Sequence, residues 1–292
     1  MIPFAKGHGL GNDYIVMDAS ALPGPLTERA IVRLCDRNWG VGSDGILLLV
    51  PTRRADFGVR IFNPDGSEAE KSGNGLRIFA KYLWDRGHAR GKTTFTVDTK
   101  GGVVECTCHE RHGRVNFVTV EMGRATFRAP DIPMNGPDRD VVAVPLQLAD
   151  GATLTATAVS VGNPHCVIFV DRLDDAEARR LGPLVERHPA FPQRTNVQFA
   201  RVAGRDTLDI LIWERGAGYT LASGSSSCGA AAAAVRNGLC GHGRVTVRMP
   251  GGTLVIDVRP DWSLRLEGPV EEVYTGTLSD EFARAWLAPE PA

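Results

Sequence analysis

Two segments of this chain share one pattern, and they lie 151 residues apart (223 − 72). In the first, Asn63 is followed by a glycine-containing turn and, nine positions on (63 to 72), by Ser72 and a glycine. In the second, Glu214 is followed by a similar turn and, nine positions on (214 to 223), by Ser223 and a glycine. Each serine precedes a helix-forming stretch, and the free N–H groups and positive dipole end of a helix N-terminus bind anions. The repeat predicts two half-sites for one small carboxylate-bearing ligand, with chemistry on both faces of a single carbon.

The repeat also divides the chain into two halves. A chain of 292 residues suits two domains of about 130–150 residues each. We expect one domain over residues 1–127 with the Ser72 helix, and a second over residues 128–275 with the Ser223 helix. The C-terminal strand in 264–292 is open to join either half.

Strand-like segments dominate both halves, because β-branched and aromatic runs alternate with Gly, Pro, Asp and Asn. Four helices are expected: residues 26–37 with Thr27 as cap, residues 175–189 beside Asp174, and the stretches that follow Ser72 and Ser223 and stop at Gly87 and Gly238. The last of these helices consists almost entirely of small residues, which suits a helix enclosed by strands. The segment 128–140, rich in Pro and Asp, is expected to be a linker.

The composition restricts the class of partner. The net charge is −1 and the pI about 6.7, which argues against a nucleic-acid partner. The apolar runs are too short for a membrane span, and the N-terminus lacks the features of a signal peptide, so we expect a cytoplasmic protein that binds no membrane. Six cysteines show no disulfide framework, and Cys106-Thr-Cys108 has no second pair to complete a zinc site. We expect reduced structural thiols and no metal.

Several groups suit an amino-acid ligand without reference to any known protein. Amide side chains can hold an ammonium and a carboxylate together, and arginine binds a carboxylate through two parallel hydrogen bonds. The side-chain candidates for substrate binding are Asn12, Asn63, Asn163, Asn196 and Arg215. Backbone N–H groups for the carboxylate are expected from Gly73, Asn74, Gly224 and Ser225.

Each candidate also has a structural interpretation. Asparagines in turns often cap the local backbone. A Glu214–Arg215 pair at a strand end is often a surface ion pair, and His165 after a proline suits a packed interior. Serine is itself a good helix N-cap. The occurrence of all these groups in one order over the chain favours the functional interpretation of the set.

Seven motifs occur along the chain in a fixed order, at residues 4–14, 40–45, 63–67, 73–77, 162–165, 194–199 and 213–218. In this order they resemble the diaminopimelate epimerase family, and the resemblance covers nearly the whole chain. It implies an α+β fold of two pseudo-symmetric β-barrel-like domains, each enclosing a central helix. It also implies a cofactor-independent epimerase that inverts one α-carbon of diaminopimelate, on the route to lysine. A homodimer is left open.

The chain departs from the family at two places that matter for the chemistry. The resemblance implies that Ser72 and Ser223 occupy the positions of two cysteines that remove and deliver the α-proton, and Cys228 matches a later, non-catalytic position. A serine hydroxyl needs an adjacent base, whereas a thiol ionises near neutral pH. The resemblance places His165 and Glu214 near these positions, so both join the serines as catalytic candidates, and Glu214 is also a binding candidate. In many family members a glutamine stands at the place of Gly45.

The two serines leave other interpretations open. The chain could be a racemase or a dehydratase of another amino acid on the same fold. It could instead be an amino-acid-binding protein that has lost its two bases, or an enzyme whose cysteines were replaced by engineering.

Overall fold

The structure is a computed structural model that describes residues 1–286, and the chain divides into two compact units. Unit 1 comprises residues 1–120 and the C-terminal part from residue 268, and unit 2 comprises residues 121–267. These bounds differ from the predicted 1–127 and 128–275, because the chain leaves and re-enters unit 1 within strands.

Segment 128–140 differs from the linker that its composition predicts. Arg128 and Asp140 form an isolated β-bridge, and Ala129 and Ile132 are buried in the hydrophobic core of unit 2. The prolines and aspartates thus shape a packed loop around the short 3-10 helix Ala129–Asp131.

Unit 1 is a strongly bent sheet with two parallel pairs, β2–β3 and β4–β6, among antiparallel ones. The strand order is β18-β1-β2-β3-β4-β6-β7-β8, and the short β5 pairs with the end of β4. The strands are β1 Ile2–Gly9, β2 Asn12–Asp18, β3 Ile46–Val50, β4 Phe57–Phe62, β5 Glu68–Ala69, β6 Thr94–Thr99, β7 Gly102–Arg111, β8 Arg114–Arg124 and β18 Glu271–Leu278.

Unit 2 has the same sequence of pairings. Its order is β9-β10-β11-β12-β13-β15-β16-β17, with β11–β12 and β13–β15 parallel and the short β14 on the end of β13. The strands are β9 Val144–Gln147, β10 Thr153–Ser160, β11 Pro164–Phe169, β12 Asn196–Gly204, β13 Thr207–Glu214, β14 Gly218–Thr220, β15 Gly243–Met249, β16 Gly252–Val258 and β17 Ser263–Pro269.

The repeat seen in the sequence is also a repeat in strand register. Ile46 pairs with Phe62 in unit 1, and the residues 151 positions later, Val197 and Trp213, pair in unit 2. The pseudo-symmetric fold implied by the family resemblance is therefore confirmed. The C-terminal strand 264–292 left open by the sequence is in fact two strands: β17 pairs with β16 of unit 2, and β18 pairs with β1 of unit 1.

All four expected helices are present, with serine, threonine or aspartate at their N-caps. They are α1 Glu28–Cys35, α2 Gly73–Asp85, α3 Asp175–Glu186 and α4 Gly224–Arg236. The side chains of Thr27, Ser72, Asp174 and Ser223 each accept a hydrogen bond from a backbone N–H of the first turn, which satisfies a group the helix leaves unpaired. Gly87 and Gly238 follow α2 and α4 with φ of +73° and +70°, which glycine tolerates at no cost.

The sequence did not predict α5, Asp280–Trp286, whose seven residues are too few for a periodic pattern. Its Trp286 packs against two arginines of unit 1, with the Arg29 and Arg33 guanidinium carbons 4.6 and 4.7 Å from the ring centroid. These contacts attach α5 to α1, whose buried face belongs to the core of unit 1.

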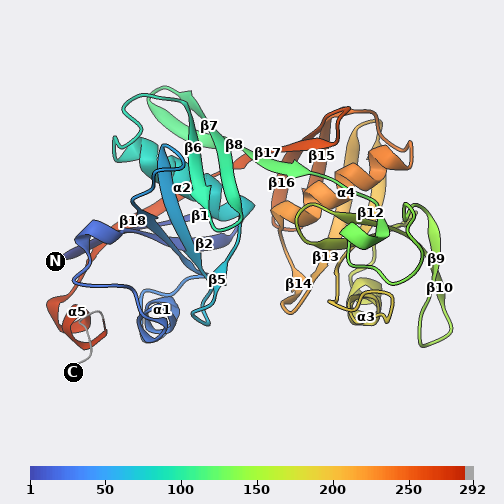
Figure 1. Ribbon diagram of the computed structural model, residues 1–292, viewed down its shortest axis with the longest axis horizontal. Helices are drawn as coiled ribbons and strands as arrows, with labels where there is room; N and C mark the ends of the chain where they lie inside the picture. Colours follow the sequence, from blue (N-terminus) through green and yellow to red (C-terminus); the bar gives the residue numbers. More distant parts are fainter. Residues whose placement is uncertain (287–292) are drawn as a thin grey trace. The chain divides into compact units, whose positions relative to one another are not determined.

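Each unit encloses one helix among its strands (Figure 1). Helix α2 contacts β1, β2, β7 and β18, and α4 contacts β10 to β13, β15 and β16. Residues 230–234 of α4, all alanine, are completely buried. Small side chains let the surrounding strands approach the helix on all sides, as its composition predicts. Within residues 1–286, no helix is long and apolar enough to cross a membrane.

Candidate active site

Ser72 stands at the start of α2 and contacts a tyrosine. Its Oγ accepts a hydrogen bond from the Gly75 backbone N–H at 3.0 Å. The Tyr14 Oη lies 3.2 Å from the same Oγ, and either hydroxyl can donate. Tyr14 comes from β2 and is 6% exposed, whereas Ser72 is half-buried. The Ser72 hydroxyl is therefore held by the helix on one side and by a buried phenol on another.

Asn12 and Asn74 are joined in one chain of hydrogen bonds beside that helix start. The Asn74 amide donates to the Asn12 Oδ1 at 3.2 Å, and the Asn12 amide donates to Asp44 at 3.0 Å. The buried Arg77 guanidinium donates to the Asn74 Oδ1 at 2.8 Å and to the Gly73 carbonyl at 3.2 Å. The charged groups at the two ends fix the orientation of both amides.

A group of charged side chains supports this network. Asp13 is bound by Lys6 at 2.7 Å and by Arg37 at 2.8 Å, and Arg37 also binds Asp44. Burial alone would raise the pKa of Asp13, but the hydrogen bonds from Arg37 and Lys6 outweigh it and lower the pKa from 3.8 to about 2. Asp13 is therefore ionised at neutral pH and holds the loop that carries Asp44.

Asn63 is part of a tight local turn. Its side-chain amide donates to the Ser67 Oγ at 3.0 Å, and its backbone N–H donates to the Ser67 carbonyl at 2.8 Å. The Gly66 N–H returns a hydrogen bond to the Asn63 carbonyl. These contacts give Asn63 the turn-stabilising role, and its role as a ligand stays a prediction.

His165 of β11 is completely buried and held neutral. The Gln198 amide, which also donates to the Ser226 Oγ, lies 3.1 Å from the His165 Nδ1. With the amide as donor, Nδ1 accepts, so the proton is on Nε2, 2.9 Å from the Asn163 Oδ1. Burial lowers the pKa of His165 from 6.5 to about 3; the hydrogen bond from Gln198 opposes this shift, and the charge of Arg215 adds to it. Both ring nitrogens are engaged, which favours a positioning role over proton transfer.

Asn196 connects β12 to the ends of two neighbouring strands. Its amide donates to the Pro164 carbonyl at 3.0 Å, and its Oδ1 accepts from the Arg215 backbone N–H at 3.0 Å. Arg215 is exposed, and its guanidinium donates to the Gln193 carbonyl at 3.1 Å. Asn163, Asn196, His165 and Arg215 are thus brought together within unit 2.

Glu214 and Ser223 are the two ends of the second repeated segment, residues 214–223. Ser223 is 5% exposed, and its Oγ accepts from the Ser226 N–H at 3.4 Å. Glu214 ends β13, is half-buried, and accepts a hydrogen bond from the Thr220 hydroxyl at 3.2 Å. Gly224 is buried and Ser225 half-buried in the first turn of α4. The approach of Ser72 to Ser223 stays a prediction.

Tyr14 and Gln198 contact predicted site residues, but the sequence did not single them out as candidates. Tyr14 lies in an apolar strand, so its sequence context predicts a hydrophobic core residue. However, Tyr14 follows Gly11-Asn12 at the same spacing at which His165 follows Gly162-Asn163. Gln198 lies two residues after Asn196 in a buried strand, where a polar side chain requires a partner. The internal repeat and the rarity of buried glutamine were the available signals.

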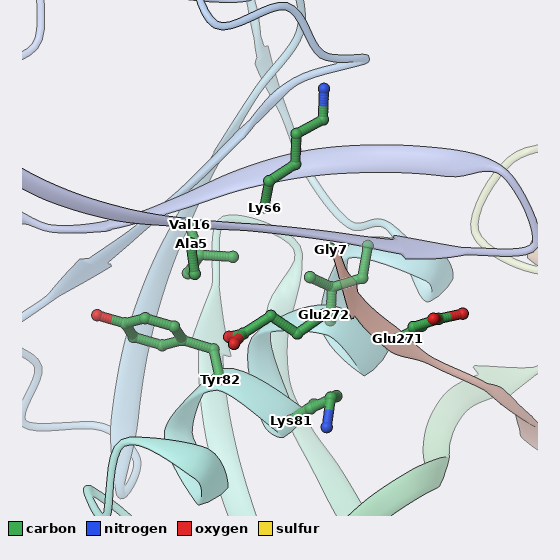
Figure 2. Close-up of a pocket in the computed structure, with 9 residues that line it drawn as sticks. Ala5, Lys6, Gly7, Val16, Lys81, Tyr82, Glu271 and Glu272 are labelled. Carbon is green, nitrogen blue, oxygen red and sulfur yellow. The ribbon is translucent and has the colours of Figure 1, made fainter. Parts of the chain in front are cut away.

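A pocket opens in unit 1 between β1, β2, α2 and the start of β18. Figure 2 shows Lys6 and Glu271 at this pocket with Lys81, Tyr82 and Glu272. None of its lining residues is among the predicted site residues. Its Lys6 also binds Asp13, so the pocket adjoins the charged group that supports the Asn12–Asn74 network.

Comparisons with known proteins agree with this fold. The sequence profile of the diaminopimelate epimerase family matches residues 4–128 and 157–277. The diaminopimelate epimerase 2 of a Nostoc species is 50% identical over 279 residues, covering 95% of this chain and 96% of that protein. The diaminopimelate epimerase of Pelotomaculum thermopropionicum is 46% identical over 276 residues, covering 94% and 97%.

A more distant likeness supports the fold alone. The crystal structure of a probable proline racemase from Agrobacterium radiobacter is similar with a TM-score of 0.68 at 16% identity, covering 99% of this chain and 98% of that one. A hydroxyproline epimerase from Agrobacterium vitis is similar with a TM-score of 0.66, also at 16% identity, covering 95% and 90%. The fold is thus shared with proteins of other substrate specificity.

Proposed function

This chain belongs to the diaminopimelate epimerase family, and we propose on that premise that it is a cofactor-independent isomerase that interconverts LL- and meso-diaminopimelate. The observation that carries the proposal is the 50% identity to a diaminopimelate epimerase over nearly the full length of both chains. The proposed product is a precursor for lysine. The alternative substrates raised by the two serines have no observation that favours them.

The proposed reaction uses Ser72 and Ser223 on opposite faces of one α-carbon. Each serine caps a helix, so the carboxylate next to that carbon would meet backbone N–H groups of Gly73, Asn74, Gly224 and Ser225. Negative charge develops on this carboxylate when the α-proton leaves, and donors fixed in advance stabilise it. The amides and Arg215 would hold the rest of the amino acid.

The proposed roles of His165 and Glu214 differ. A neutral, doubly hydrogen-bonded imidazole holds Asn163, so we assign His165 to positioning. Glu214 is half-buried at the end of β13 and keeps one hydrogen-bond donor, Thr220, on its carboxylate. A carboxylate can act as the base of a serine hydroxyl, and Glu214, nine residues before Ser223 in the repeated segment, is the proposed partner of that serine.

The test is α-proton exchange in D2O, followed by NMR with LL- and meso-diaminopimelate, proline and hydroxyproline. Loss of the α-proton signal of diaminopimelate alone supports the proposed function. Exchange with another amino acid alone would show that the proposed substrate is wrong. Binding of diaminopimelate without exchange would refute the proposed isomerase activity. The double variant Ser72→Ala, Ser223→Ala is the control, because it removes both hydroxyls; since both serines cap helices, its fold is first verified by circular dichroism.

We further propose that the protein works in the cytoplasm as a homodimer. The proposed cytoplasmic location is supported by its named relatives, which are bacterial biosynthetic enzymes. Light scattering on the purified chain tests the proposed homodimer: a mass of one chain at micromolar concentration would contradict the dimer.

A further inference from the structure

We propose that Tyr14 and Ser72 form one proton-transfer pair, in which the Tyr14 phenolate takes up the proton of the serine hydroxyl and the resulting phenol returns it. The contact between the Tyr14 Oη and the Ser72 Oγ, at 3.2 Å, is the observation that carries this proposal. The inference rests on the proposed function for its reaction, but the pair itself can be tested without turnover.

The hydrogen bonds at Ser72 leave its proton available to the phenol. The Ser72 Oγ already accepts from the Gly75 N–H, which uses one of its two lone pairs. A hydroxyl also carries one donor, and the phenol oxygen is a neighbour that can accept it. The geometry thus allows a relay from the Ser72 Oγ to the Tyr14 Oη with no change of backbone.

Gly45 makes room for the phenol ring. A Cβ at Gly45 would lie 2.7 Å from the Tyr14 Cε1 and 2.4 Å from the Phe62 carbonyl oxygen, closer than such atoms approach. The absence of a side chain at Gly45, where the family resemblance leads one to expect glutamine, therefore has a structural reason. Tyr14 occupies the space next to Ser72.

The internal repeat places Tyr14 at the position of His165 in unit 2. Asn12 lies two residues before Tyr14, as Asn163 lies two residues before His165. Tyr14 is on β2, which pairs in parallel with β3, and His165 is on β11, which pairs in parallel with β12. His165 has its ring nitrogens engaged by Asn163 and Gln198. Tyr14 instead reaches the capping serine directly, so the two units are chemically unequal at this position.

The surroundings of the phenol bear on its ionisation. The charged groups on the elements around the phenol are Asp13 and Asp18 on β2, Lys6 and His8 on β1, Asp44 before β3, Lys71 before α2, and Arg77, Lys81 and Asp85 on α2. Lys6 is bound to Asp13, and Arg77 donates to Asn74. Burial opposes a phenolate, whereas the N-terminus of α2 favours negative charge at its cap.

The proposed step conserves atoms and charge. The Cα–H bond of the substrate breaks, and its proton forms a bond to the Ser72 Oγ. At the same time the original Ser72 O–H bond breaks, and that proton forms a bond to the Tyr14 phenolate oxygen. The negative charge moves from the phenolate to the substrate, where it spreads onto the carboxylate and is stabilised by the helix N–H groups. The reverse step returns both protons. A phenol titrates at about pH 10, far below an aliphatic hydroxyl, so it is the better store for this proton.

The variant Tyr14→Phe removes one oxygen and keeps the ring, and Tyr82→Phe on α2 is the matched control. Because the phenolate is the proposed base, the kcat of the parent should rise with pH. We expect kcat for Tyr14→Phe to fall by about 10²-fold with a small change in KM, and this rise of kcat with pH to disappear. A ring-fluorinated tyrosine at position 14 should move that rise to lower pH. Equal pH profiles for Tyr14→Phe, Tyr82→Phe and the parent would overturn the proposal.

An independent measurement separates the pair from the proposed function. If no amino acid exchanges its α-proton, the proposed function fails, and the pair is then tested by NMR of isotope-labelled tyrosine. Replacing Ser72→Ala should shift the Tyr14 ring resonance and the pH at which it titrates, and leave Tyr82 unchanged. A Tyr14 signal that does not respond to Ser72→Ala would refute the contact itself.

Discussion

Single residues decide which groups in each unit can move a proton. His165 looks like a base in the sequence, but complete burial and two hydrogen bonds keep it neutral. Tyr14 looks like a core residue, but its hydroxyl reaches Ser72. A sequence shows the type of a side chain, whereas the chemistry depends on which neighbours that side chain meets.

The buried neutral state of His165 predicts a pH dependence of stability. Its pKa falls from 6.5 to about 3 on folding, so the unfolded chain binds the extra proton between these values. The free energy of unfolding should fall by about 1.4 kcal/mol per pH unit below about pH 6.5 because of this group. Denaturant unfolding of the parent and of His165→Gln between pH 7 and pH 5 measures it. The same slope in both proteins would contradict the burial of a neutral imidazole.

Asp13 predicts a second pH dependence, at lower pH. Its folded pKa of about 2 is below its ordinary value of 3.8, so its contribution is complete above about pH 4 and is lost as pH falls through about 2. Asp13→Asn should lower the free energy of unfolding at pH 7 by about 2 kcal/mol, and the difference should shrink below pH 4. The exposed Asp171→Asn is the control. A difference that persists undiminished at pH 3 would show that packing, not charge, is the cause.

The helices and strands are the level at which the sequence was most informative. The N-caps at Thr27, Ser72 and Ser223 are local signals, so the starts of three helices could be predicted from neighbouring residues. The unit boundaries could not be predicted, because β8 and β17 each cross them and strand partners are set by contacts far apart in sequence. Segment 128–140 has the composition of a linker, but Ile132 inserts into a core.

The close packing of α4 against His165 predicts that a side chain at Gly229 would be destabilising. A Cβ there would lie 3.1 Å from the His165 Cγ and 3.2 Å from its Cβ, so the glycine lets the ring pack against the helix. Gly229→Val should lower the free energy of unfolding by about 1–3 kcal/mol through overpacking. Gly241→Val, at an exposed site where the nearest atom to the added Cβ is the Asp206 Oδ1 at 4.0 Å, should change it by less than about 0.5 kcal/mol. Equal thermal midpoints for the two variants would contradict this packing.

The whole molecule is two copies of one topology with different side chains at equivalent positions. Tyr14 corresponds to His165, Asn63 to Glu214, and Gly45 to Asn196, all with the same separation as the two serines. A duplicated frame thus holds two helix starts with unequal partners. Such inequality suits a reaction in which one unit removes a proton while the other delivers one.

The duplicated frame predicts a gain of activity from two substitutions. A thiol ionises more readily than a hydroxyl, and a helix N-terminus lowers its pKa further. The double variant Ser72→Cys, Ser223→Cys should therefore epimerise diaminopimelate faster by at least about 10²-fold, since the proposed binding amides and Arg215 are unchanged in it. Initial rates by chiral chromatography check it. A folded double variant that binds diaminopimelate but gains no rate would point to another substrate.

The central claim is that two groups act on opposite faces of one α-carbon, and the position of deuterium at early times tests it most directly. LL-diaminopimelate is mixed with the protein in D2O, and both stereoisomers are analysed by mass spectrometry before a tenth of the substrate has reacted. Two groups predict deuterium in the meso product and almost none in the recovered LL-substrate, because the proton removed and the deuteron delivered are held by different residues. A meso product that retains the original proton, or recovered substrate as heavily labelled as the product, would contradict the account.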